Sequence, residues 1–142
     1  MTKEIKTQIT IHAVPEKIWA VLTDFENYPN WNPFITSLSG TVEKGMTITV
    51  KIEPPSSSPM TFRPVVLERI ENKELRWLGK LLFKGLFDGE HMFELIDHKN
   101  GTATFIQSEK FSGLLIDLLN LDKTKMGFEA MNQKLKELVE KK

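Results

Sequence analysis

The sequence of 142 residues contains no cysteine. Disulfide scaffolds, thiolate metal sites and cysteine nucleophiles are therefore excluded. Three histidines leave little material for a metal site built from several of them. No apolar run approaches the roughly 18 residues of a membrane-spanning helix, and the first residues lack the apolar stretch of a secretion signal. We therefore expect a cytoplasmic protein with no transmembrane segment, no metal and no cofactor.

A surplus of charge of one sign is also lacking. Lys and Arg total 19 and Asp and Glu total 19, so the formal net charge is zero. Nucleic-acid-binding proteins need a basic surplus to neutralise phosphates, and we expect no nucleic-acid partner here. The length and apolar content are those of one globular domain with a substantial core, and we expect residues 1–142 to form it.

Alternation of apolar and polar residues predicts strands along much of the chain. The segments that read as strands are residues 4–13, 46–53, 61–70, 74–78, about 87–98 and 102–111. Residues 53–59 contain three prolines and three serines, so they read as an exposed loop between two strands. Residues 71–73 read as a turn.

Helical spacing is found near both ends of the chain. Pro15 suits the first turn of a helix, whereas Pro29 and Pro33 allow only short helical pieces. Residues 125–141 predict one long helix, with Phe128, Met131, Leu135 and Val139 on its apolar face. This order predicts an α+β fold, in which a curved antiparallel sheet of about seven strands wraps around the long helix and two short helices follow the first strand. Such a fold leaves a cavity between helix and sheet.

Four signatures in the right order carry a family resemblance. They are Val14-Pro15-Glu16-Lys17-Ile18-Trp19; the run from Asp24 to Phe34; Leu75 to Gly79 followed by Gly85 to Phe93; and Glu109 to Gly113 with Gly127 to Asn132. The chain resembles the helix-grip superfamily, called SRPBCC, of START lipid-transfer domains, birch-pollen-allergen-like proteins and polyketide cyclase/dehydrase-like proteins. The resemblance covers nearly the whole chain. It implies a helix-grip fold with a ligand cavity but says little about a reaction, because members include binders, carriers and enzymes.

The hairpin around Asn100-Gly101 fixes a register that can be worked out from the apolar faces. Inward residues on both strands must point the same way, which requires a three-residue loop, 99–101, with Gly101 in the left-handed conformation. A strict two-residue turn would place the apolar sets on opposite faces. The longer loop pairs residue 95 with 105 and residue 93 with 107. It therefore predicts that His91 lies directly opposite Glu109, with Gln107 alongside.

This polar group has two interpretations. The first is a hydrogen-bonded cluster beneath the long helix that lines a cavity or holds the register. The second is proton transfer by His91 and Glu109. We favour the first, because buried polar pairs are more often satisfied than reactive. Asn132 lies on the apolar face of the helix, where it must find partners in the sheet, in water or in a ligand.

Two apolar features remain ambiguous. Trp77 is expected to face inward, whereas Trp31 is either a loop anchor or a cover for the cavity mouth. The segment Leu81–Phe87 contains apolar residues next to glycines. It is either a twisted strand packed on both faces or a lip that admits ligand, touches a membrane or forms a weak dimer contact.

Two functions from different classes follow. The first is binding or carriage of a small hydrophobic or amphipathic molecule, lipid-like or polyketide-like. The second is a polyketide cyclase or dehydratase reaction that uses His91 and Glu109. The residues expected to line the ligand site are Trp31, Trp77, Phe87, His91, Phe93, Phe105, Gln107, Glu109, Phe128 and Asn132. We favour binding, because the inward face is rich in aromatic residues and the sequence lacks a recognisable catalytic set.

Overall fold

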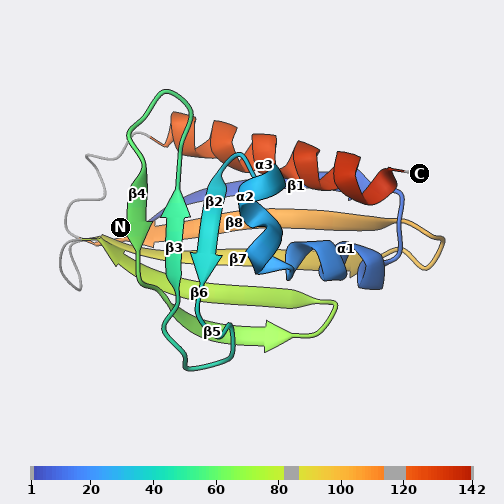
Figure 1. Ribbon diagram of the computed structural model, residues 1–142, viewed down its shortest axis with the longest axis horizontal. Helices are drawn as coiled ribbons and strands as arrows, with labels where there is room; N and C mark the ends of the chain where they lie inside the picture. The colour runs from blue at the N-terminus through green and yellow to red at the C-terminus, as the bar shows by residue number, and fades with distance from the viewer. Residues whose placement is uncertain (1, 82–86, 114–120, 142) are drawn as a thin grey trace.

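The computed structural model describes residues 2–81, 87–113 and 121–141. Its elements in chain order are β1 (Thr2–Ile11), α1 (Pro15–Leu22), the 3-10 turn η1 (Phe25–Asn27), α2 (Tyr28–Trp31), β2 (Ile35–Ser39), β3 (Thr49–Ile52), β4 (Met60–Phe62), β5 (Val65–Ile70), β6 (Glu74–Leu81), β7 (Phe87–Asp97), β8 (Ala103–Ser112) and α3 (Asp122–Glu140). Five long strands form an antiparallel sheet in the order β1-β8-β7-β6-β5, and β2-β3-β4 form a second one. The long helix α3 lies along the first sheet (Figure 1). The predicted helix-grip architecture is confirmed.

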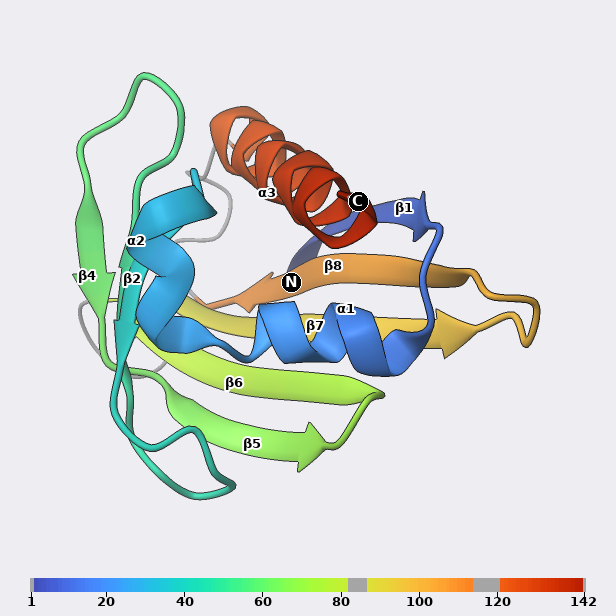
Figure 2. The same cartoon turned by 45° about the vertical axis from the view of Figure 1, so that its right-hand side comes forward.

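The two sheets are joined at a corner that the sequence did not predict. Residues 61–70 were expected to form one strand, but the structure breaks it at Arg63-Pro64 into β4 and β5. Proline has no amide hydrogen to donate to a ladder. Across the corner, the segment before β3 continues the pairing, because Ile48 N donates to Pro64 O at 2.9 Å and Val66 N donates to Met46 O at 2.9 Å. The β2-β3-β4 sheet therefore stands as a wall at one end of the long strands (Figure 2).

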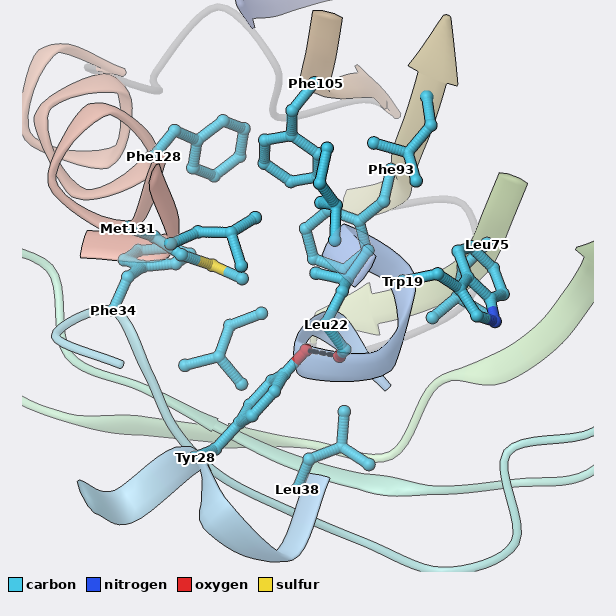
Figure 3. Close-up of a cluster of buried hydrophobic side chains, with 14 of the residues drawn as sticks. Trp19, Leu22, Tyr28, Phe34, Leu38, Leu75, Phe93, Phe105, Phe128 and Met131 are labelled. Atoms are coloured by element: carbon cyan, nitrogen blue, oxygen red, sulfur yellow. Dashed lines mark hydrogen bonds between the residues drawn. The ribbon is translucent and has the colours of Figure 1, made fainter. Parts of the chain in front are cut away.

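The apolar face of α3 packs on the concave side of the long sheet, as predicted. Phe128, Met131, Leu135 and Val139 are all buried. Phe34, which precedes β2, meets Phe128 edge to face, with ring centroids 5.3 Å apart (Figure 3). Gly127 is needed at this crossing, because a Cβ there would lie 2.8 Å from Cε1 of Phe34 and nearer still to Cδ1.

The chain's single tyrosine anchors the short helices. Tyr28 is fully buried, and its hydroxyl donates to the carbonyl of Leu22 at the end of α1 (Figure 3). Burial, and second the negative charge of Asp24, raise the pKa of the Tyr28 hydroxyl above its usual value of 10.0. The neutral phenol is thus the form that fits the core.

A polar cluster fastens the C-terminal end of α3 to the end of β1. Glu140 Oε2 accepts from the His12 backbone amide at 2.7 Å, from Lys136 Nζ at 2.6 Å and from His12 Nδ1 at 3.1 Å. Lys136 also donates to Thr10 O at 2.8 Å. The His12 backbone hydrogen bond first, and then the Lys136 ammonium, lower the pKa of Glu140 from 4.5 to about 2. The carboxylate is therefore the form that holds the helix end.

Candidate functional site

The hairpin between β7 and β8 has the predicted register. His91 pairs with Glu109, Phe93 with Gln107 and Leu95 with Phe105. The loop closes with a hydrogen bond from His98 N to Thr102 O at 3.1 Å, and Gly101 has a φ of 86°, in the left-handed region. The predicted three-residue loop is confirmed. It places the imidazole and the carboxylate side by side on the inward face of the sheet.

A chain of hydrogen bonds links this pair on β7 and β8 to two other elements, α3 and β1. His91 Nδ1 lies 3.0 Å from Glu109 Oε1, and His91 Nε2 lies 3.0 Å from Gln107 Oε1. Gln107 Nε2 donates to Asn132 Oδ1 at 2.8 Å, and Asn132 Nδ2 donates to Thr7 Oγ1 at 2.8 Å. The Thr7 hydroxyl donates to Gln107 O at 2.9 Å. The buried amides of Gln107 and Asn132 are thus satisfied by protein and join α3 to β1 and β8.

The backbone carbonyl of Gln107 determines which group donates and which accepts in each hydrogen bond of this chain. Because the carbonyl oxygen of Gln107 can only accept, the Thr7 hydroxyl donates to it and accepts from Asn132. The amide nitrogen of Asn132 therefore faces Thr7, and its oxygen accepts from Gln107. The side-chain oxygen of Gln107 is then left facing His91, so His91 Nε2 carries a hydrogen.

The other ring nitrogen shares one proton with Glu109. A 3.0 Å contact between His91 Nδ1 and Glu109 Oε1 needs a proton between the two atoms, since two lone pairs repel each other. The pair is either an imidazolium beside a carboxylate or a neutral imidazole beside a carboxylic acid. Its net charge is zero in both forms.

Three aromatic rings fix the plane of the imidazole. Trp77 stacks on His91 with centroids 5.2 Å apart and an interplanar angle of 15°. Phe93 and Phe128 meet the imidazole edge to face, at 4.8 and 5.0 Å. With both nitrogens hydrogen-bonded and these rings packed around it, His91 has no nitrogen left to offer a ligand.

A cavity of about 250 Å³ opens beside this pair, at the end of the long strands where the β2-β3-β4 wall stands. Its apolar lining residues are Phe34, Ile35, Val50, Ile52, Pro54, Met60, Phe62, Pro64, Trp77, Phe111 and Leu121. Its polar lining residues are Ser57, Asp88, His91, Glu109, Lys123 and Thr124, and Gly79 and Gly89 complete it. The β3–β4 loop meets the start of α3 there, where Lys123 Nζ donates to Ser56 O at 3.3 Å.

The structure divides the predicted site residues into separate groups. Trp77, His91 and Glu109 line the cavity. The buried residues Phe93, Phe105, Gln107, Phe128 and Asn132 lie outside its lining, in the core and the polar chain. Trp31 contacts Tyr28 and lines a shallow groove between α2 and α3, away from this cavity. The side chain of Phe87 lies outside the described residues, as does most of the Leu81–Phe87 lip.

Sequence reasoning missed most of the cavity wall. Val50, Ile52 and Phe62 come from the β2-β3-β4 wall, Phe34 immediately precedes β2, and Leu121 immediately precedes α3. Alternation showed that residues 46–53 have an apolar face, but it could not show which other element that face meets. Pro64, where the chain turns the corner, was the available signal.

The described part of the chain offers no group of three or more acidic, histidine or cysteine side chains that could hold a metal ion. Nor does it contain a helix long and apolar enough to cross a membrane.

Comparison with known proteins places the chain in a family. The sequence profile of the family described as "polyketide cyclase / dehydrase and lipid transport" matches residues 2–140. The chain belongs to this family. No curated protein matches the sequence. Membership in the polyketide cyclase/dehydrase and lipid transport family confirms the resemblance to the SRPBCC superfamily.

Solved structures with the same fold have names that describe different kinds of protein, including a synthase. Ginseng major latex-like protein 151 from Panax ginseng superposes with a TM-score of 0.80 at 11% identity, over 98% of each chain. A START superfamily protein from Mycobacterium smegmatis has a TM-score of 0.72 at 18% identity, over 96% of this chain and 97% of that one. Norcoclaurine synthase from Thalictrum flavum, in complex with dopamine and hydroxybenzaldehyde, has a TM-score of 0.70 at 12% identity, over 98% and 87%. At these identities the likeness shows the fold alone.

Proposed function

We propose that this protein binds and carries a small hydrophobic or amphipathic molecule in the cavity between its sheet and the start of α3. The observation that carries the proposal is the composition of the wall: most side chains that line the cavity of about 250 Å³ are apolar, and a few are polar. Ligand sites typically combine a mainly apolar wall with a few placed polar groups. The family description, which includes lipid transport, supports the same function.

The state of His91 favours binding over turnover. A general base needs a nitrogen within reach of the substrate, and both imidazole nitrogens are already engaged by Glu109 and Gln107. The chain of hydrogen bonds behind them runs to a backbone carbonyl, so it ends in a fixed structure rather than at a reacting group. His91 is thus best suited to orient Glu109.

The test is a blocked cavity. Gly79 lies on the cavity wall, and a Cβ there meets ordinary contacts of 3.8 Å to Pro64 Cβ and 3.9 Å to Gly89 O. Gly79→Phe should therefore fill the cavity without breaking the strand. Lys80→Phe places the same ring on the neighbouring exposed position and is the matched control.

We expect a fluorescent apolar probe to bind the wild type and Lys80→Phe with saturable, competable affinity and to bind Gly79→Phe at least tenfold more weakly. Native mass spectrometry of protein purified from its own host should show a bound small molecule that Gly79→Phe lacks. Equal probe binding by the folded wild type and Gly79→Phe would contradict the proposal.

A polyketide cyclase or dehydratase reaction is the second candidate. It is favoured by the family description and by the presence of the Glu109 carboxyl group on the cavity wall. In that case Glu109 transfers the proton, and His91 holds the Glu109 carboxyl group in place. Steady turnover of a polyketide-like substrate that is lost in both His91→Gln and Glu109→Gln, with folding intact, would favour the enzyme. Cytoplasmic location and the lip contact remain predictions from the sequence.

A further inference from the structure

One oxygen of Glu109 is available to a ligand. Glu109 Oε1 is held by His91, whereas Oε2 has no hydrogen-bond partner within the described ranges 2–81, 87–113 and 121–141. The Glu109 side chain is 18% exposed, compared with 5% for His91. Oε2 stands directly over Gly89, where the Cβ of any other residue would overlap it. Since Gly89 and Glu109 both line the cavity, this oxygen is presented to the cavity's contents.

The oxygen can act only as an acceptor while the pair keeps its geometry. The one proton shared by His91 and Glu109 lies between Nδ1 and Oε1, which leaves lone pairs on Oε2 in either form of the pair. A ligand that fills this end of the cavity without a donor would strip water from Oε2 and leave it unsatisfied, at a cost in affinity. A ligand with a donor would replace that water.

The charge of the site selects among donors. The His91–Glu109 pair is neutral in sum, and the other charged residues on the wall, Asp88 and Lys123, have opposite signs. The described wall therefore has no net charge to balance an ionised ligand, which would also lose its hydration on entering a mainly apolar space. A carboxylate would in addition face the lone pairs of Oε2.

From this geometry we infer that the bound molecule carries a neutral hydroxyl group that donates to Glu109 Oε2, and that Glu109 makes the protein prefer alcohols and phenols over hydrocarbons and over acids. The inference rests on the proposed ligand-binding function and deepens it. The apolar body of the ligand lies against Trp77 and Phe111, which line the cavity beside Glu109. A cavity of about 150 Å³ accommodates benzene, so this one suits roughly ten non-hydrogen atoms, or two fused rings.

Naphthalene derivatives test the inference by isothermal titration calorimetry on the wild-type protein. The probes are β-naphthol, with a hydroxyl donor; naphthalene and β-naphthyl methyl ether, without a donor; β-naphthoate, an anion; and β-naphthylmethylammonium, a cation. A hydrogen bond to Oε2 predicts that β-naphthol binds about three- to a hundredfold more tightly than naphthalene or the ether, with the largest ratio if Glu109 is the carboxylate. Both charged probes should bind more weakly than β-naphthol.

Two variants assign the preference to Glu109. Glu109→Met keeps the length of the side chain and removes the acceptor, so β-naphthol should lose its advantage over naphthalene. Gly79→Ala narrows the cavity without touching the carboxyl group, so both probes should weaken while their ratio is kept. A thermal melt establishes that each variant is folded.

The outcomes separate this inference from the function on which it rests. If naphthalene and β-naphthol bind the wild type with equal affinity and Gly79→Phe abolishes both, the cavity binds ligands but the hydroxyl preference is wrong. The same conclusion follows if β-naphthoate or the ammonium probe binds most tightly, or if Glu109→Met keeps the β-naphthol advantage. If no probe binds, the proposed function fails along with the inference.

Discussion

For Gly127→Ala, the structure predicts a loss of stability, whereas the usual rule for helices predicts a gain. In a helix interior, alanine is more stable than glycine by about 1 kcal/mol. At Gly127, however, the new Cβ would lie 2.8 Å from Phe34 Cε1 and 3.2 Å from Cγ, inside the roughly 3.5 Å at which carbon atoms are in contact. Overpacking a core typically costs about 1–3 kcal/mol.

To relieve this overlap, the Phe34 ring must shift away from its edge-to-face contact with Phe128, in which the ring centroids are 5.3 Å apart (Figure 3). The cavity that Phe34 lines leaves room for such a shift, but the shift sacrifices the aromatic contact. We therefore take the upper part of that range. The net effect of Gly127→Ala should be a loss of about 1–2 kcal/mol in the free energy of unfolding, or about 0.5–1 M in the urea midpoint.

A double-mutant cycle assigns the loss to the ring. In a Phe34→Ala background, which removes Cγ, Cδ1 and Cε1 together, the effect of Gly127→Ala on stability should change sign, and the substitution should stabilise the protein by up to about 1 kcal/mol. Comparing Glu129→Ala with Glu129→Gly, at an exposed position of the same helix, measures the propensity term alone. If Gly127→Ala stabilises the wild type, or destabilises both backgrounds equally, the packing explanation is wrong.

Three further predictions concern the core and the helix end. Leu135→Asp should abolish the cooperative thermal transition, since an unpaired buried carboxylate costs several kcal/mol, whereas Gln133→Asp on the exposed face should melt near the wild type. Because burial raises the pKa of Tyr28 above 10.0, the stability that the neutral phenol contributes is complete below pH 10 and is lost at higher pH. In an absorbance titration, Tyr28 should therefore ionise only as the protein unfolds. The pKa of Glu140 is lowered from 4.5 to about 2, first by the His12 backbone amide, so the stability that its carboxylate contributes is present above pH 4.5 and is lost as the pH falls toward 2. In urea unfolding, the stability of Glu140→Gln should therefore depend less on pH over that range than the stability of the wild type does.

The hairpin register could be predicted because a single constraint decided it. Side chains alternate along strands, so matching the apolar faces of β7 and β8 left one loop length that fits, and the pairing of His91 with Glu109 followed. The polar chain through Gln107 and Asn132 could be predicted only in part. The sequence placed both residues on inward faces, but only the three-dimensional structure shows that they satisfy each other.

The position of the cavity could not be predicted, because it depends on where distant elements meet. Trp31 shows this limit, because the proline spacing indicated an irregular segment but fits a Trp31 ring over the cavity as well as a ring over another groove. In the structure, Trp31 lines the groove beside α3. Pro64 shows it in another way. A proline is compatible with an edge strand or with a corner, and only the pairing of Ile48 with the Pro64 carbonyl identifies the corner.

The inward face of the long sheet explains why the cavity lies at one end. Along β7, inward positions pass from Phe93 to His91 and then to Gly89, so the side chains become smaller toward the β2-β3-β4 wall. Gly89 pairs with Gly79 on the neighbouring strand, which leaves two adjacent inward positions with no side chain at all. The carboxyl group of Glu109 reaches over one of them, and its route there requires that residue 89 have no Cβ. The two glycines therefore leave the volume empty, and His91 holds the acceptor that faces it.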